Sequence, residues 1–487
     1  MKKLKLLPLT LLMGLFLISC NTNSQQISIS SVEKAAKELS AEPARPAGQT
    51  DVIGLACDPI PTVRVGFVGL GMRGKGAVRR FLHIDGIEVK ALCDLEQFNL
   101  DIVKDTLANY NVTGVEEYTG EDGWKKLCER DDIDLVYICT HWGMHTPIAV
   151  YAMEQGKHVA IEVPAAQTIE ECWQLVNTAE KTRRHCMQLE NCCYGEFELN
   201  TLNMAQKGLF GEIVHAEGAY IHDLRRLNFS PRLNQGEAYE PGVGAIASAG
   251  RTQGPIGYWD QWRLKENTEK NGNLYPTHGF GPVCQALNIH RGDKLDHLVS
   301  LSSNQFSMTE YAKEKFGADS EEAKRTYKEG DMNISLIKTA KGKSIMVQHD
   351  VALPRQYSRI HMLSGTKGFA LQFPVHQIIL NGEHRPLNKE DMEKVLKENE
   401  HPFITELGDK ARRVGGHGGM DYVMDYRLVY CLRNGLPLDQ DVYDAAEWSC
   451  ITPLSEFSVA NGSYPVKVPD FTRGAWQKQQ GYKQSYK

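Results

Sequence analysis

Residues 63–74 read Val63-Arg-Val-Gly-Phe-Val-Gly-Leu-Gly-Met-Arg-Gly74, a short apolar run followed by the pattern Gly-x-Gly-x-x-Gly. The run favours a buried strand, and Gly69, Gly71 and Gly74 lie where that strand would turn into a helix. Glycines there permit a tight turn and a close approach of the backbone to a pyrophosphate. Asp94 ends the next apolar run, about 20 residues later, where a carboxylate binds ribose hydroxyls and repels a 2′-phosphate. A structural turn with a solvated aspartate is the alternative, but the four features together predict a Rossmann domain that binds NAD.

The pattern that follows alternates between predicted strands and helices, which is typical of a parallel sheet covered on both faces. We therefore predict a doubly wound α/β Rossmann domain over residues 62–190. Its strands are predicted at 62–69, 88–94, 133–140, 158–163 and, more weakly, 185–189, and its helices include 146–155 and 168–182.

After Asn191 the predicted strands become longer, and few crossover helices separate them. This change favours a C-terminal substrate domain, residues 191–487, of α+β class with a large, open and mostly antiparallel sheet. Its strands are predicted at 212–221, 295–306, 332–339, 344–351, 360–364 and 369–373, and its last helices at 420–434 and 442–461.

The N-terminus has the pattern of an export signal. Three lysines precede the apolar run 6–18, which is short for a membrane span. The run ends in Leu17-Ile-Ser-Cys20, which resembles a bacterial lipobox, although a plain signal peptide is the alternative. We predict a signal peptide at 1–19, lipidation with palmitate at Cys20, and a polar tether with little fixed structure at 20–61. The chain is then an exported lipoprotein anchored to a membrane, in the periplasm or at the cell surface.

The composition bears on partners. The net charge is −6 and no basic run stands out, so we predict no nucleic-acid partner. The 16 histidines show no metal-binding spacing on a helix, so we predict no metal. The 12 cysteines have no regular spacing, and we interpret most of them as buried thiols. The oligomeric state stays open, with a homo-oligomer possible.

From Val63 onward the motifs resemble the glucose-fructose oxidoreductase / inositol dehydrogenase (Gfo/Idh/MocA) family. The resemblance implies an N-terminal Rossmann domain and a C-terminal domain built on a large open sheet. Many members carry Glu-Lys-Pro after the fourth strand, where the lysine assists proton transfer. This chain has Glu162-Val163-Pro164, and valine cannot carry a proton, which argues against a simple sugar-alcohol dehydrogenase.

A closer resemblance is to glycoside hydrolase family 109, whose members cleave α-N-acetylgalactosaminides with bound NAD. It is carried by Trp142-Gly-Met-His145, Glu162-Val163, Glu190-Asn191, Gly218-Ala-Tyr-Ile-His-Asp-Leu-Arg225, Tyr275-Pro-Thr-His278, Arg355-Gln-Tyr357 and Gly416-His-Gly-Gly-Met-Asp421. With the glycine motif, it implies NAD contacts at Gly69, Gly71, Met72, Arg73, Gly74, Asp94, Trp142, Gly143, Met144, His145, Glu162, Val163 and Asn191. It implies sugar contacts at Tyr220, Arg263, Tyr275, Pro276, Thr277, His278 and Tyr357. The pattern departs from the family at Gly143 and Met144.

The same residues make chemical sense on their own. Tyr275 and His278 bring a phenol and an imidazole together within four residues, and both can transfer protons. They are our catalytic candidates, with Tyr357 assisting or holding the sugar. His222, Asp223 and Arg225 are equally consistent with satisfied polar groups at a sheet edge. The glycine-rich string around His417 is either a surface turn or a close approach to another domain or ligand.

Three functions compete. The first is a glycosidase that removes terminal α-N-acetylgalactosamine from glycans and regenerates its own NAD. The second is a secreted NAD-dependent sugar oxidoreductase, and the third a sugar-binding lipoprotein with a degenerate cofactor site. Val163 argues against the second, and the intact glycines with Asp94 argue against the third. An exported protein cannot easily exchange nicotinamide cofactors with the cytoplasm, which favours the first.

Overall fold

The structure is a computed structural model that describes residues 29–230 and 257–486. The predicted signal peptide and the predicted lipidation site Cys20 lie outside the described residues. Within the described ranges, no helix combines the length and the apolar character needed to cross a bilayer.

The N-terminal domain is the predicted Rossmann fold. Its six strands are all parallel and lie in the order β3-β2-β1-β4-β5-β6. The central strands are buried along their whole length, as expected for a sheet covered on both faces. The strands are β1 Val63–Val68, β2 Ile87–Cys93, β3 Glu116–Tyr118, β4 Leu135–Ile138, β5 His158–Ile161 and β6 Cys186–Gln188, and the helices are α2 Met72–Phe81, α3 Gln97–Asn109, α4 Gly123–Cys128, α5 His145–Glu154 and α6 Ile169–Thr182.

The C-terminal domain is built on an eight-stranded sheet in the order β13-β12-β11-β7-β10-β9-β8-β14. Among the described strand pairs of this second sheet only β7 with β10 is parallel, so the predicted mostly antiparallel sheet is confirmed. The predicted strand 295–306 ends earlier than expected, at Ser302. The strands are β7 Ile213–Ile221, β8 Leu295–Ser302, β9 Asn333–Thr339, β10 Ser344–Asp350, β11 Met362–Gly365, β12 Phe369–Leu371, β13 Gln377–Ile379 and β14 Val466–Lys467.

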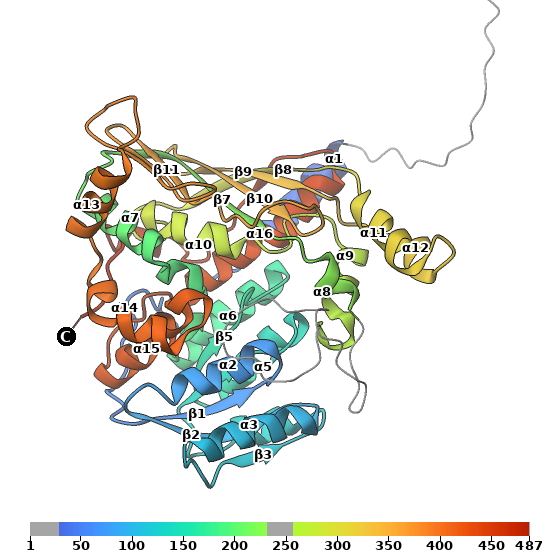
Figure 1. Cartoon of the computed structure of the whole chain (residues 1–487), viewed down its shortest axis with the longest axis vertical. Coiled ribbons are helices and arrows are strands. Elements are labelled where there is room, and N and C mark those ends of the chain that lie inside the picture. Colours follow the sequence, from blue (N-terminus) through green and yellow to red (C-terminus); the bar gives the residue numbers. More distant parts are fainter. Residues whose placement is uncertain (1–28, 231–256, 487) are drawn as a thin grey trace, which may run out of the picture.

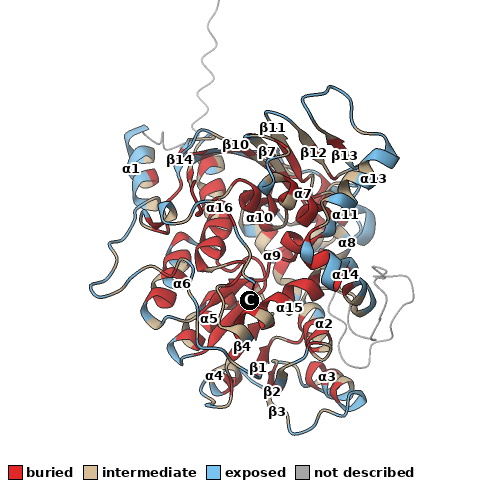
Figure 2. Ribbon diagram, turned by 90° about the vertical axis from the view of Figure 1, so that its left-hand side faces the viewer, coloured by how far each residue is buried: buried red, intermediate tan, exposed pale blue. Residues whose placement is uncertain are grey.

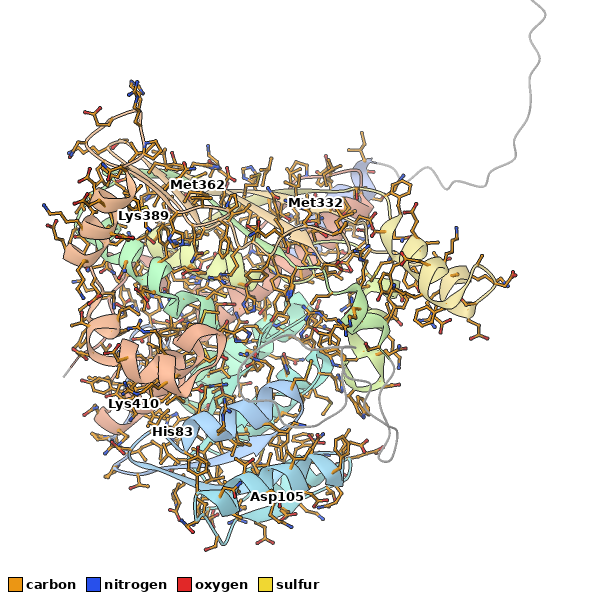
Figure 3. All side chains as sticks on the ribbon, in the orientation of Figure 1. His83, Asp105, Met332, Met362, Lys389 and Lys410 are labelled. Carbon is orange, nitrogen blue, oxygen red and sulfur yellow. The ribbon has the colours of Figure 1, made fainter. Side chains whose placement is uncertain are left out.

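Helices cover one face of this sheet. In Figure 1 the sheet crosses the top of the molecule, with α7, α10 and α16 beneath it and the Rossmann domain below them. Met332 and Met362 mark the level of the sheet in Figure 3. The helices and short 3-10 turns (η) include η2 Asn191–Tyr194, α7 Glu196–Gln206, α8 Arg225–Phe229, α9 Trp262–Glu269, α10 Thr277–Ala286, α11 Ser307–Phe316, α12 Glu321–Lys324, α13 Lys389–Glu398, α14 Pro402–Val414, η4 His417–Gly419, α15 Met420–Asn434 and α16 Val442–Ala460.

A backbone contact between α10 and β7 sets the position of the candidate site. A Cβ atom on Gly279 would lie 2.0 Å from the amide nitrogen of Ala219, and one on Gly218 would lie 2.2 Å from the carbonyl oxygen of Gly279. Only glycine permits so close an approach. The contact brings the start of α10 next to the end of β7, which carries Tyr220.

The prediction of little fixed structure in the segment 20–61 is wrong for its described part. Helix α1 spans Ile29–Leu39, and the chain that follows packs against both domains. Arg45 pairs with the buried Glu180 at 2.9 Å, and the amide nitrogen of Val52 donates to the Tyr443 hydroxyl at 3.0 Å. These partners are remote in sequence, so the polar composition of the segment gave no sign of them.

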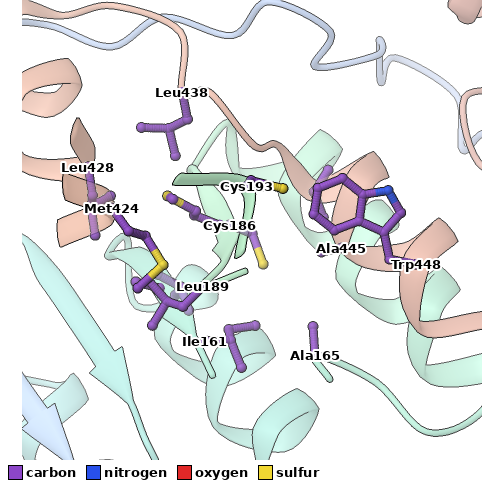
Figure 4. Packing of buried hydrophobic residues seen from close by; sticks show 14 of the residues in the cluster. Ile161, Ala165, Cys186, Leu189, Cys193, Met424, Leu428, Leu438, Ala445 and Trp448 are labelled. Atoms are coloured by element: carbon purple, nitrogen blue, oxygen red, sulfur yellow. The ribbon is translucent and has the colours of Figure 1, made fainter. Parts of the chain in front are cut away.

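The two domains share one hydrophobic core. Figure 2 shows buried residues continuing from the Rossmann strands into the C-terminal helices, and Figure 3 labels His83 and Lys410 on either side of the junction. Most of the described cysteines are buried free thiols, as predicted. In the close view of Figure 4, Ile161, Ala165, Cys186 and Leu189 of the first domain pack with Cys193, Met424, Leu428, Leu438, Ala445 and Trp448 of the second.

Candidate active site

The glycine motif adopts the conformation that the sequence predicts. Gly69 has φ +89°, and a Cβ atom on it would lie 2.6 Å from the backbone carbonyl group of Cys139. A Cβ on Gly74 would lie 1.9 Å from the Gly69 oxygen, so this glycine packs helix α2 against the turn. At Gly71 nothing lies within 4 Å, which leaves open space where a dinucleotide would approach the start of α2.

A cavity of about 490 Å³ opens at this turn, beyond the carboxyl ends of the Rossmann strands. The Asp94 carboxylate is held beside it by the Leu70 amide nitrogen, which donates at 2.6 Å. These features fit NAD, with backbone amides for the pyrophosphate and a fixed carboxylate for the ribose. Of the predicted NAD residues, Gly69, Gly71, Met72, Arg73, Asp94 and Met144 line the cavity, together with Lys75, Trp124, His141, Trp259 and Trp262, which were not predicted.

Glu162 and Asn191 support the cavity wall through a network of ion pairs and hydrogen bonds at the domain junction. Arg73 donates to Glu162 at 2.8 Å and to Asp421 at 3.1 Å, and Asn191 donates to Asp421 at 2.5 Å. His417 lies 2.9 Å from the same aspartate. The glycine-rich string therefore approaches another domain closely, one of the two interpretations left open by the sequence.

Four other predicted NAD residues lie outside the cavity lining. Trp142 is buried and stacks on Tyr275, with ring centroids 5.7 Å apart, and Val163 is buried in the same cluster. The His145 ring lies between the carbonyl oxygens of Pro164 and Thr140, at 2.7 and 3.0 Å, where it ties together the loops after β4 and β5. A Cβ atom on Gly143 would meet the His141 ring at 3.5 Å. Their contacts with NAD stay predictions.

The predicted sugar residues do come together. The rings of Tyr220 and Tyr275 lie 4.6 Å apart, and the ring of His278 lies 5.4 Å from Tyr220. The Tyr275 hydroxyl lies 3.4 Å from Nε2 of His278. The Arg263 guanidinium lies 4.5 Å from the Tyr275 ring centre. Pro276 and Thr277 are buried at the start of α10 and orient these side chains.

Sequence analysis quoted Glu190 in one of the family strings but assigned it no role in the site. Glu190 is fully buried directly after β6, and its two carboxylate oxygens lie 2.8 and 3.0 Å from Nδ1 of His278. Burial raises the pKa of Glu190, but the charge and hydrogen bond of His278 outweigh it and hold that pKa below its ordinary value. An ionised Glu190 accepts the Nδ1 proton of His278 and leaves Nε2 facing Tyr275. Its position after the last parallel strand was the available signal.

A sulfur atom completes a three-residue cluster around this pair. Sγ of Cys192 and the ligand atoms of Glu190 and His278 all lie within 4.8 Å of one another, a spacing that could hold a metal ion. The backbone amide of Cys192 also donates to Glu190 at 3.0 Å. The absence of a metal stays a prediction.

Tyr357 joins the cluster through His222. The Tyr357 and His222 rings lie 5.1 Å apart, and Nδ1 of His222 lies 3.1 Å from the Tyr220 hydroxyl. Burial, with the nearby charge of Arg263, lowers the pKa of His222 to about 4, so its imidazole is neutral at pH 7. Burial raises the pKa of Tyr357 to about 12.

Asp223 and Arg225 fit the interpretation that they are satisfied polar groups at a sheet edge. The Arg225 guanidinium binds the Asp223 carboxylate at 2.7 Å, so the two satisfy each other at the end of β7.

The fold matches sugar dehydrogenases of known structure. A levoglucosan dehydrogenase in complex with NADH and levoglucosan aligns with a TM-score of 0.61 at 16% identity, covering 84% of this chain and 100% of that one. An apo scyllo-inositol dehydrogenase from Lactobacillus casei aligns with a TM-score of 0.56 at 14% identity, covering 84% and 99%. At these identities the likeness establishes the fold alone.

The sequence matches are much stronger. An alpha-N-acetylgalactosaminidase from Bacteroides fragilis is 57% identical over 431 residues, covering 88% of this chain and 96% of its own length. Glycosyl hydrolase family 109 protein 2 from Phocaeicola vulgatus is 53% identical over 429 residues, covering 88% and 99%. Residues 63–189 match the oxidoreductase family with an NAD-binding Rossmann fold, and residues 194–478 match the glycosyl hydrolase 109 C-terminal domain. The chain therefore belongs to glycosyl hydrolase family 109 and carries an NAD-binding Rossmann domain ahead of that family's C-terminal domain.

Proposed function

We propose that the chain hydrolyses terminal α-N-acetylgalactosamine from glycans and reuses one NAD in every turnover. The observation that carries the proposal is the chain of contacts from Glu190 through His278 to Tyr275. The Tyr275 ring stacks on Trp142, which packs against Trp262 in the wall of the NAD cavity. Most glycosidases place two carboxylates across the bond that breaks. Among the described residues of this cluster, the carboxylate of Glu190 is hydrogen-bonded to His278, so it is not free to act as one of such a pair. The name of the Bacteroides fragilis relative supports the substrate.

When bound, NAD supplies reversible hydride acceptance at carbon 3 of the sugar, so no net oxidation accumulates. The residues of the chain then have to move protons. A ketone at carbon 3 makes the proton at carbon 2 acidic, and a base that removes it allows the group at carbon 1 to leave by elimination. Water then adds at carbon 1 while a proton returns to carbon 2, and the carbon 3 ketone is reduced again by the hydride that was taken from it.

The Tyr275 and His278 pair is suited to this proton transfer. Burial raises the pKa of Tyr275 well above its ordinary value, so its hydroxyl keeps its proton unless a neighbour accepts it. Nε2 of His278 is that neighbour, because Glu190 occupies Nδ1. Arg263 and Tyr220 pack on the Tyr275 ring and fix its orientation.

Turnover of an aryl α-N-acetylgalactosaminide in deuterated water, with no added NAD, tests the proposal. We expect deuterium at carbon 2 of the released sugar, since elimination and addition exchange that proton with solvent. Mass spectrometry and proton NMR measure it. Products free of deuterium contradict the elimination, and net formation of NADH supports the secreted sugar oxidoreductase instead.

The cofactor choice is a separate prediction. The carboxylate of Asp94, fixed by the Leu70 amide, repels the 2′-phosphate of NADP. We expect protein denatured after purification to release NAD rather than NADP, as measured by chromatography of the supernatant. Asp94→Ser should relax this preference, and recovery of mainly NADP from the unchanged protein contradicts it.

We also propose that the protein is an exported lipoprotein anchored through Cys20. The proposal is supported by the lysines, the apolar run and the Leu17–Cys20 string of the N-terminus. We expect Cys20→Ser to abolish incorporation of labelled palmitate and to release the protein from the membrane fraction. A variant that stays in that fraction after a high-salt wash contradicts the anchor.

A further inference from the structure

Both domains contribute to the wall of the NAD cavity. A Rossmann domain on its own binds a dinucleotide in an open crevice beyond the carboxyl ends of its strands. Here the loops after β1, β2 and β4 form one side of the cavity, and a short stretch of the C-terminal domain forms the other. That stretch lies directly before Arg263 of the sugar cluster, and its lining residues are Gly257, Tyr258, Trp259 and Trp262.

Trp259 contacts two loops of the Rossmann domain at once. Its indole Nε1 donates to a carboxylate oxygen of Glu96, in the loop after β2, at 3.3 Å. Its ring lies nearly parallel to the imidazole of His141, in the loop after β4, with centroids 6.0 Å apart and an interplanar angle of 19°. Burial lowers the pKa of His141, so this imidazole is neutral at pH 7. Trp259 therefore connects two loops that both line the cavity.

The loop after β2 marks the adenosine end of the cavity. Asp94, whose carboxylate is placed for the ribose hydroxyls, lies two residues before Glu96. Leu95 is 49% exposed and Trp259 is 39% exposed, so the contact between Trp259 and Glu96 lies at the outer rim of the cavity. Adenine suits such a rim, because bases pack on the faces of aromatic side chains.

The stretch that carries Trp259 is held from the side of the sugar cluster. The buried Arg263 donates to the Tyr258 hydroxyl at 2.7 Å and fixes the residue before Trp259. Asp260 and Gln261 both have positive φ, +51° and +46°, so the chain turns sharply between Trp259 and helix α9. Non-glycine residues adopt this conformation at a cost and keep it where the surrounding structure holds it. Trp259 is therefore presented to the Rossmann domain by a fixed turn.

We propose that Trp259, hydrogen-bonded to Glu96 and packed beside His141, is a cofactor-binding residue that holds the adenosine end of NAD and limits the rate of its release. A dinucleotide under a contact between the two domains can leave only after that contact opens. Slow release suits a cofactor that is reused in every turnover. The proposal rests on NAD binding by the Rossmann domain and not on the proposed glycosidase activity.

Exchange of bound NAD for isotopically labelled NAD measures this release. The NAD-loaded protein is mixed with excess labelled NAD and no glycoside, and samples are desalted and denatured at intervals. Mass spectrometry of the supernatant gives the labelled fraction against time. We expect Trp259→Ala to exchange about 10- to 100-fold faster than the unchanged protein, the usual effect of losing an aromatic contact with a base. Phe306→Ala changes an exposed aromatic residue outside the cavity lining and should exchange at the unchanged rate.

Two further variants test the hydrogen bond between the domains while an aromatic ring stays at position 259. Trp259→Phe removes the donor and Glu96→Ala removes the acceptor of the same bond. Each should speed exchange about 3- to 10-fold, the usual effect of losing one hydrogen bond. The double variant should exchange no faster than the quicker single variant, because the bond is already lost. Effects that multiply in the double variant, or exchange rates that none of the variants changes, overturn the proposal.

Thermal unfolding at saturating NAD separates faster release from a folding defect. Trp259 and Glu96 lie at the rim of the cavity, so we expect all variants to unfold at the temperature of the unchanged protein. If Trp259→Ala unfolds earlier, Trp259→Phe and Glu96→Ala decide the outcome. Exchange in the unchanged protein as fast as in Trp259→Ala overturns the proposal. Failure of the glycosidase assay leaves this measurement intact, because exchange is followed without substrate.

Discussion

His278→Ala is expected to lower kcat on aryl α-N-acetylgalactosaminides by a factor on the order of 10²–10⁴, the usual contribution of a general acid or base. His278 is the one described residue that contacts both the buried carboxylate of Glu190 and the hydroxyl of Tyr275. Its removal interrupts the proton path but leaves the glycine turn and Asp94 intact. The purified variant should therefore still contain NAD, measured after denaturation. A variant with full activity removes His278 from the mechanism.

Glu190 acts through His278, so it is a positioning residue. We expect the loss of kcat in its variants to depend on how well the new side chain holds the His278 ring. Glu190→Gln keeps the shape but offers only one acceptor, and we expect kcat to fall about 10- to 100-fold with little change in KM. Glu190→Asp keeps the charge and should recover part of that loss. A purely structural role would instead lower NAD content and stability in both variants without this order in kcat.

Asp421→Asn is expected to destabilise the whole chain by about 3–5 kcal/mol, the typical effect of breaking a buried ion pair. Asp421 is 1% exposed, and it faces Arg73 at 3.1 Å, Arg80 at 3.5 Å and His417 at 2.9 Å. The amide is neutral, so the two guanidinium groups lose a shared counter-charge inside the domain junction. Urea unfolding of the NAD-loaded protein, followed by fluorescence, measures the shift.

Asp425 provides a matched control one turn later on the same helix. It accepts from Arg80 at 2.7 Å and from the Tyr137 hydroxyl at 2.8 Å. Burial raises the pKa of Asp425 to about 6, so folding disfavours its ionised form relative to the unfolded chain, although the carboxyl is still mostly ionised at pH 7. Asp425→Asn should therefore cost less stability than Asp421→Asn, and equal losses contradict the assignment of Asp421 as the central counter-ion.

The two aspartates also have opposite pH dependences. Burial raises the pKa of Asp421, but Arg73 and Arg80 outweigh it and hold that pKa well below 3.8 in the folded state. Its contribution to stability is therefore complete above about pH 4 and is lost as the pH falls toward the folded value. Asp425 has a raised pKa, so its contribution is complete below about pH 4 and declines as the pH rises through 6.

Local patterns were sufficient to predict the scaffold. The glycine turn, the apolar run before it and Asp94 lie close together in sequence, and their geometry follows from backbone sterics. The long strands of the second sheet alternate or run apolar over several residues and were found within a few positions. The two-residue strand β14 and the edge strands β3 and β13 were not predicted, because two or three residues carry no periodicity.

The active site was predicted in part. The strings around Tyr275 and Tyr220 supplied its central rings, but Glu190 pairs with His278 across 88 residues of sequence. The position of Glu190 after a strand was visible in the sequence, but its pairing with His278 depends on how α10 packs against the end of β6, which no local pattern encodes. The ordered segment 29–61 was missed for the same reason, since Arg45 and Val52 find their partners in α6 and α16.

The backbone contact between Gly218 and Gly279 limits how this enzyme can change. Most active sites can be adjusted by repacking the side chains behind them, but here two bare backbones define the separation of Tyr220 from Tyr275. That spacing is independent of side-chain volume, so mutations elsewhere in the core leave it unaltered. New sugar specificities should consequently arise in the region around Arg263, and libraries that diversify the two glycines should yield inactive protein.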